Sequence, residues 1–155
     1  MRHFKYFLLI TSFSIPNFLI AHCQIPCGIY DDALRIIQLE ENFRTINKAM
    51  NKIINLSESS DSTSKNQLIR WVITKDEHAH QIQKILSNYF LSQRIKGSNS
   101  KYTDQTILLQ KLLVAAMKCK QTVDTNNVKL GQDLIDQFVE TYFDEHGIKH
   151  LNELK

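Results

Sequence analysis

The sequence predicts an all-α protein, an antiparallel four-helix bundle with a hook at its N-terminal end. Glycine and proline are scarce, with four and two residues among 155, whereas a β-sandwich or barrel needs many turns. Apolar residues recur at alternating spacings of three and four, as in helices that bury one face. Short polar segments separate four such stretches, and short connections favour antiparallel neighbours.

Residues 1–21 have the pattern of a cleaved leader. Arg2 and Lys5 precede a mostly apolar run, and the small residue Ala21 closes the segment. This layout is typical of a secretory signal peptide, and the apolar run is shorter than the ~20 residues of a membrane span. The alternative is a signal anchor that stays attached. Cleavage after Ala21 leaves residues 22–155 as one domain.

Without this leader the chain carries little net charge. The formal charge of +3 falls by two when Arg2 and Lys5 are removed. A near-neutral surface gives no electrostatic reason to expect nucleic acid or an acidic membrane as a partner.

The first helix is expected from residue 32 onward. Asp31 or Asp32 can cap its N-terminus, and its apolar residues then form a bundle seam. These residues are Ile36, Leu39, Phe43, Ile46, Met50 and Ile53. The stretch S-E-S-S-D-S-T-S, residues 57–64, has no apolar side chain and is expected to be a loop.

A second helix is expected to begin at Ser64, because Ser64 and Gln67 have the spacing of a capping box. Its stripe consists of Leu68, Val72, Ala79, Ile82, Leu86 and Tyr89. The stripe fades before the polar stretch K-G-S-N-S, residues 96–100.

Thr103 is expected to cap a third helix, which is apolar enough that most of its circumference must be buried. Its apolar residues are Ile107, Leu108, Leu112, Val114, Ala115 and Ala116. Residues 125–127 break the pattern. A fourth stripe is then expected to end near Gly147, a natural residue after a helix. It consists of Leu130, Leu134, Phe138, Val139 and Tyr142.

Residues 22–30, H-C-Q-I-P-C-G-I-Y, contain the only cluster of soft metal ligands in the sequence. A free N-terminal His22 offers an imidazole and an α-amine that titrates near ~7.7–8.0, so a metal can displace its proton. Cys23 and Cys27 add two thiolates. Amine, intervening amide nitrogen and two sulfurs form a planar set that suits Cu(II) or Ni(II), whereas zinc prefers a tetrahedral set. The sequence therefore predicts a metal-binding hook.

A Cys23–Cys27 disulfide is the alternative, since an oxidising compartment favours disulfides. The protein would then be a secreted helical-bundle binding protein without a metal. The spacing of the two cysteines does not decide between these possibilities. His22 at the predicted new terminus favours the metal site.

The hook resembles that of nickel superoxide dismutases, whose pattern is H-C-x-x-P-C-G-x-Y at a processed N-terminus. Every fixed position matches. Two further stretches, R-W-V-I-T-K-D-E-H-A (residues 70–79) and S-N-Y-F (residues 87–90), resemble the second helix of that family. The resemblance implies a homohexamer of four-helix bundles with one nickel ion per subunit. It also implies disproportionation of superoxide to dioxygen and hydrogen peroxide, with nickel cycling between Ni²⁺ and Ni³⁺.

The resemblance also implies roles for individual residues. His22 would bind nickel through its amine and imidazole, Cys23 through its thiolate and backbone amide, and Cys27 through its thiolate. Tyr30 would screen the open axial face and admit small anions. Tyr89 resembles a second tyrosine near that face.

Residues around the ligands depart from the family pattern. Gln24 stands where some members carry an acid. The family ties the imidazole to a carboxylate on the first helix and a basic residue on the second. These positions fall at Gln38 and His78, with Glu40 or Glu41 as alternative carboxylates.

The remaining candidates are expected to be structural. Cys119 is read as a half-buried core thiol, and His146 and His150 as part of a solvated C-terminal tail. A secretory leader predicts a periplasmic or secreted protein. A pro-segment trimmed by a dedicated protease would instead be compatible with the cytoplasm.

Overall fold

The computed structural model describes residues 31–155, so the predicted leader and hook lie outside the described residues. Within residues 31–155 the chain is helical and has no strand. The elements are α2 (Asp32–Leu56), α3 (Ser62–Lys84), the π-helix η1 (Ile85–Arg94), α4 (Tyr102–Gln121), α5 (Asn126–Tyr142) and α6 (Glu145–Leu154). The prediction of an all-α protein is confirmed for this part of the chain.

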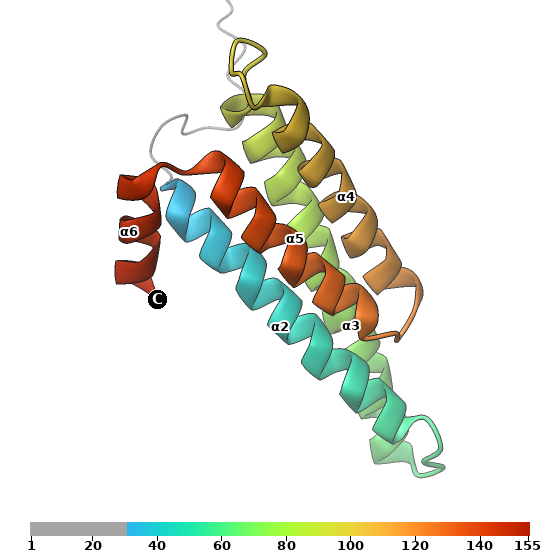
Figure 1. The fold of residues 1–155 in the computed structure, drawn as a ribbon. Helices are drawn as coiled ribbons and strands as arrows, with labels where there is room; N and C mark the ends of the chain where they lie inside the picture. The colour runs from blue at the N-terminus through green and yellow to red at the C-terminus, as the bar shows by residue number, and fades with distance from the viewer. Residues whose placement is uncertain (1–30) are drawn as a thin grey trace, which may run out of the picture.

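The long helices pack side by side as a bundle (Figure 1). Helix α2 packs against α3 and α5, and α4 packs against α3, η1 and α5. Successive helices alternate in direction, and the short helix α6 lies beside the first half of α2 (Figure 1). Among the described helices, none is both long and apolar enough to span a membrane.

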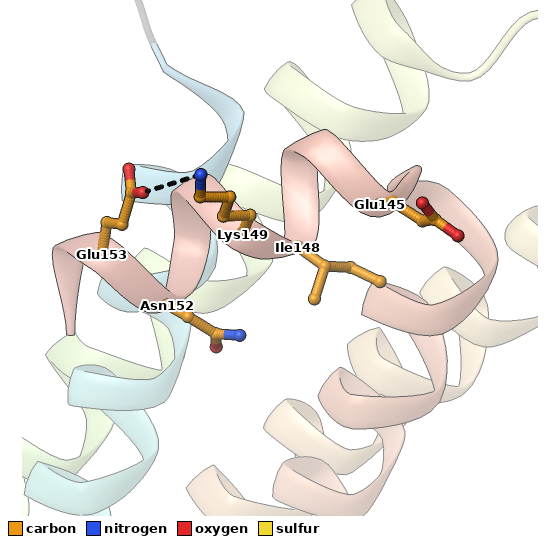
Figure 2. Close-up of a pocket in the computed structure, with 5 residues that line it drawn as sticks. All are labelled: Glu145, Ile148, Lys149, Asn152 and Glu153. Atoms are coloured by element: carbon orange, nitrogen blue, oxygen red, sulfur yellow. Dashed lines mark ion pairs between the residues drawn. The ribbon is translucent and has the colours of Figure 1, made fainter.

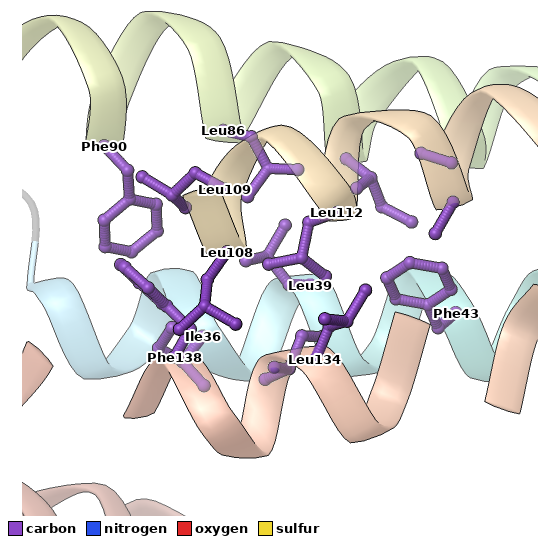
Figure 3. Packing of buried hydrophobic residues seen from close by; sticks show 14 of the residues in the cluster. Ile36, Leu39, Phe43, Leu86, Phe90, Leu108, Leu109, Leu112, Leu134 and Phe138 are labelled. Atoms are coloured by element: carbon purple, nitrogen blue, oxygen red, sulfur yellow. The ribbon is translucent and has the colours of Figure 1, made fainter. Parts of the chain in front are cut away.

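The core follows the predicted seam of α2, all six residues of which are buried. Phe43 of α2, Phe90 of η1 and Phe138 of α5 are fully buried and lie between the helices (Figure 3). Each buried side chain of this size contributes about 1.5–3 kcal/mol of transfer free energy. Packing between helices therefore holds the bundle together.

Helices α2 and α5 approach each other closely at Gly131. A Cβ atom at this position would lie 2.3 Å from both Cε1 and Cζ of Phe43. The missing side chain leaves room for the aromatic ring, so Gly131 sets how closely the two helices pack.

Two predicted helix starts are corrected by the structure. Asp31 caps α2, as expected, and its Oδ1 accepts a hydrogen bond from Ala33 N at 2.7 Å. The capping box at Ser64 is wrong, because Asp61 caps α3 instead and accepts from Ser64 N at 2.9 Å. The aspartate stands three residues earlier and is a strong cap, so the loop is shorter than predicted. Helix α4 begins at Tyr102 without a side-chain cap, rather than at a Thr103 cap.

The predicted end of the fourth helix is also wrong. Helix α5 ends at Tyr142, and Asp144 caps a new helix, α6, by accepting from Gly147 N at 2.8 Å. Gly147 lies in the first turn of α6, where a Cβ atom would lie 2.4 Å from Cδ1 of Phe143. The expected solvated tail is therefore a helix packed on the bundle.

Several residues of the predicted stripes face solvent. Ile107 and Leu130 are 46% and 45% exposed, and Val72 is also exposed. Helix α4 has neighbours on only part of its circumference, so the expectation that it is mostly buried is wrong. The burial of Leu108, Leu112, Ala115 and Ala116 is as predicted.

Candidate metal centre

The predicted ligands His22, Cys23 and Cys27, together with Tyr30, lie outside the described residues. The structure shows the end of the bundle to which this segment is joined. Asp31 directly follows Tyr30 in the sequence. The start of α2 is therefore the described part of the chain that is adjacent in sequence to the candidate centre.

The carboxylate of Asp32 is the centre of a polar cluster at this end of the bundle. Its Oδ1 accepts a hydrogen bond from the hydroxyl of Tyr89 and lies 2.9 Å from Nε of Arg94. Its Oδ2 accepts from the hydroxyl of Tyr142 at 2.7 Å. Residues from α2, η1 and α5 thus meet at one carboxylate.

The π-helix η1 brings Tyr89 and Arg94 together. Nη2 of Arg94 donates to the hydroxyl of Tyr89 at 2.8 Å, and Cζ of Arg94 lies 4.9 Å from the ring centroid. In an α-helix, residues five apart point about 140° away from each other. The i→i+5 hydrogen bonding of a π-helix brings them onto the same side instead.

Burial keeps both tyrosines of the cluster protonated. Burial, followed by the hydrogen bond to Asp32, raises the pKa of Tyr89 to about 12. The same two causes raise the pKa of Tyr142 as well. Aromatic contacts fix the rings, since Phe90 makes edge-to-face contacts with Tyr89 at 5.2 Å and with Tyr142 at 5.5 Å between centroids.

Asp31, the neighbour of Asp32, is contacted by a residue of α6. Its Oδ2 lies 2.5 Å from Nε2 of His150 in α6. This hydrogen bond is the main cause that lowers the pKa of Asp31. Two consecutive aspartates therefore attach the start of α2 to η1, α5 and α6. The sequence alone did not indicate these contacts.

The residues predicted to surround the imidazole of His22 lie on α2 and α3, whereas the imidazole itself lies outside the described residues. Gln38 is exposed and accepts a hydrogen bond from Nη1 of Arg35 at 2.7 Å. Nδ1 of His78 lies 2.6 Å from Oδ1 of Asn42. Asn42 follows Gln38 by one helical turn and shares its face of α2. The structure thus brings His78 to Asn42, a residue that sequence reasoning missed.

The alternative carboxylates, Glu40 and Glu41, lie on the same helix as Gln38. Glu40 forms an ion pair with Lys155, with 2.6 Å between Oε1 and Nζ. Glu41 is exposed.

Cys119 is buried in the core, as predicted, and is more deeply buried than expected. Burial raises the pKa of its thiol to about 11, so the thiolate that a metal requires does not form near neutral pH. Among residues 31–155 no group of three or more His, Cys, Asp or Glu side chains is placed to hold a metal ion. The two thiolates and two nitrogens of the hook would supply a donor set that fits nickel and would also suit Cu(II).

A shallow pocket on α6 gives no second candidate centre. It is lined by Glu145, Ile148, Lys149, Asn152 and Glu153 (Figure 2). All five belong to one helix, and the ion pair between Lys149 and Glu153 spans 3.8 Å on its exposed side (Figure 2). The pocket lacks converging groups from another element.

Residues 31–155 form a helical bundle, and the sequence before them contains two cysteines, Cys23 and Cys27, whose thiolates would suit the metal of a redox metalloprotein. The family of nickel-containing superoxide dismutases matches residues 18–146. The chain belongs to this family. It is a nickel-dependent superoxide dismutase, an oxidoreductase whose substrate is superoxide. No curated protein and no solved structure matches the chain.

Proposed function

We propose that the nickel ion of this enzyme is bound by His22, Cys23 and Cys27 after removal of residues 1–21. The family match includes the whole of residues 22–30. Burial withholds Cys119, the third cysteine, from metal binding. The donor chemistry of the hook is the single observation that carries this proposal.

Nickel, when bound, supplies the one-electron redox chemistry of superoxide disproportionation. The residues of the chain bind the metal and control access to it. In this proposal Tyr30 screens the open face of the site and limits access to small anions. Tyr89 remains protonated, with a pKa of about 12, and keeps its proton on the hydroxyl that faces Asp32.

Mass spectrometry of the mature protein, combined with metal analysis, tests the ligand set. We expect an N-terminal His22 and one nickel ion per subunit. Cys23→Ser and Cys27→Ser are expected to abolish nickel-dependent activity. A variant that retains Ala21 has no free α-amine on His22, so full activity with nickel in that variant would refute the amine ligand.

The same measurements separate the alternatives. A Cys23–Cys27 disulfide in fresh, metal-replete protein would refute the nickel hook and favour a helical-bundle binding protein. Copper in protein grown with both metals available would replace nickel in the same donor set.

We also propose that residues 22–155 assemble as a homohexamer. Three apolar residues, Ile69, Val72 and Ile73, occupy neighbouring positions on the exposed face of α3, and Ile69 and Ile73 are 61% and 63% exposed. Such a stripe supports a contact between subunits. Ile73→Asp is expected to lower the mass measured by light scattering, whereas an unchanged mass would remove this stripe from the interface.

We further propose that the protein is exported to a periplasm or out of the cell. The basic residues Arg2 and Lys5, the apolar run and Ala21 support a signal peptide. Fractionation of cells that express the full chain tests this. Mature protein beginning at His22 but retained in the cytoplasm would indicate a pro-segment instead.

A further inference from the structure

Asp32 centres a polar cluster that is not required to cap α2. Helix α2 is already capped by Asp31, whose Oδ1 accepts hydrogen bonds from Ala33 N at 2.7 Å and Leu34 N at 3.4 Å. Asp32 is therefore not needed to satisfy the first amide groups of α2. A partly buried carboxylate next to an aromatic core costs desolvation free energy unless donors surround it.

Those donors are supplied by residues distant in sequence. Tyr89 lies 57 positions from Asp32 and Tyr142 lies 110 positions from it. Arg94 contacts both the carboxylate of Asp32, at 2.9 Å from Nε, and the hydroxyl of Tyr89, at 2.8 Å from Nη2. Through Asp32 the four side chains form one connected network.

The backbone of η1 is shaped to make this network possible. Only the π-helical stretch brings Arg94 over the ring of Tyr89, and the backbone hydrogen bond from Ile95 N to Phe90 O, at 3.0 Å, closes its last turn. π-Helical stretches occur frequently at functional sites, because they change the direction of a few side chains within a helix.

The network also lies next to the hook in the chain. Asp32 is two residues after Tyr30, the last residue of the hook motif. Any movement of Asp32 would therefore move the point at which the hook leaves the bundle.

We propose that Asp32, Arg94 and Tyr142 are positioning residues of the nickel site. They fix the start of α2, the point at which the chain continues from the hook, and the phenol of Tyr89 relative to one another. This proposal rests on the hook as the nickel site. A displacement of about 1 Å in such a site can lower the rate by about a hundredfold.

The test compares Asp32→Asn, Arg94→Gln and Arg94→Lys in the mature, nickel-loaded protein. Its readouts are the charge-transfer absorption of the nickel–thiolate centre, its electron paramagnetic resonance spectrum, and kcat and KM for superoxide. We expect Asp32→Asn and Arg94→Gln to alter both spectra and to lower kcat about tenfold or more, with nickel still bound. Arg94→Lys keeps the charge and is expected to recover part of kcat.

Glu153→Gln is the control, because it removes another ion-paired carboxylate, on α6, and leaves Asp32 intact. It is expected to keep wild-type spectra and kcat. If Asp32→Asn does not fold, Tyr142→Phe removes a single hydroxyl from the network while retaining the ring, and it should alter the spectra in the same direction.

The outcomes separate the positioning role of the Asp32 network from the binding of nickel by the hook. Wild-type spectra and kcat in Asp32→Asn, Arg94→Gln and Tyr142→Phe would overturn the positioning role while leaving the nickel hook intact. Nickel that remains bound in Cys27→Ser with an unchanged spectrum would overturn the hook and this proposal together.

Discussion

His150 of α6 contacts Asp31, the residue that caps α2. The imidazole Nε2 lies 2.5 Å from Oδ2 of the carboxylate. The next residue, Leu151, is buried in the core, and Lys155 forms an ion pair with Glu40 at 2.6 Å. Helix α6 is thus attached to α2 at several points along its length. The family match ends at residue 146, so these contacts lie beyond the matched region.

We predict that His150→Ala destabilises the protein in a pH-dependent way. The contact lowers the pKa of Asp31 in the folded state. A lowered carboxyl pKa contributes stability above the ordinary aspartate pKa of ~3.9, and this contribution is lost as pH falls through the lowered value. Because both side chains are partly exposed, the loss should be about 0.5–1 kcal/mol near pH 6. Urea unfolding at several pH values measures it.

His146→Ala is the control, because His146 is an exposed histidine on the same helix. It should leave the free energy of unfolding unchanged. A loss in His150→Ala that is as large at pH 2.5 as at pH 6 would show that the contact with the Asp31 carboxylate is not its cause.

We predict that Gly131→Ala destabilises the bundle. The new methyl group would lie 2.3 Å from two ring atoms of Phe43, which is fully buried and has little room to move. Overpacking of this kind costs about 1–3 kcal/mol, and the better helix propensity of alanine offsets about 1 kcal/mol. The net loss of up to about 2 kcal/mol is measurable by chemical denaturation.

Gly97→Ala provides the comparison, because a Cβ atom there meets nothing within 4 Å. It should be close to neutral. Phe43→Leu in the Gly131→Ala background should recover part of the loss, and a strictly additive double mutant would argue against a direct clash.

The helical bundle was predictable because its information is local and periodic. All six residues of the predicted α2 seam are buried, since each lies on the face that a 3.6-residue period defines. Helix boundaries were less predictable. Asp61 and Ser64 are both good caps, and only the structure shows which one the chain uses.

The candidate site was also predictable only in part. The hook motif is a continuous stretch, so its ligands could be named from residues 22–30 alone. The Asp32 network depends on a π-helix and on residues up to 110 positions apart, and no periodic pattern encodes either. The start of α6 had a usable signal, because Asp144 is a preferred N-cap residue and the acidic Glu145 follows it in the first turn.

We predict that Lys75→Met destabilises the C-terminal end of α4. Lys75 is 4% exposed, and its Nζ donates to the carbonyl oxygens of Cys119 at 2.8 Å and Lys120 at 2.6 Å. These carbonyls belong to the last turn of a helix, where intrahelical donors run out and a cation is favourable. The expected loss is about 1–3 kcal/mol.

Hydrogen exchange localises this effect. Amides of residues 116–122 should exchange faster in Lys75→Met, with smaller changes at the start of α4. Lys84→Met, at an exposed lysine of the same helix α3, should change neither exchange nor stability. Uniform loss of protection across the bundle in Lys75→Met would point to a general packing defect instead.

We predict that Cys119 is chemically silent in the folded enzyme. Its buried thiol has a pKa raised to about 11, and only the thiolate reacts with alkylating reagents or binds metal. In reduced, metal-free mature protein at pH 8, two thiols should therefore react quickly and the third only after unfolding. Cys119→Ala should remove the slow thiol, keep one nickel ion per subunit and cost about 1 kcal/mol of stability. Loss of a fast thiol or of nickel in Cys119→Ala would place this residue in the metal centre, because the hook would then lack one of its proposed thiolates.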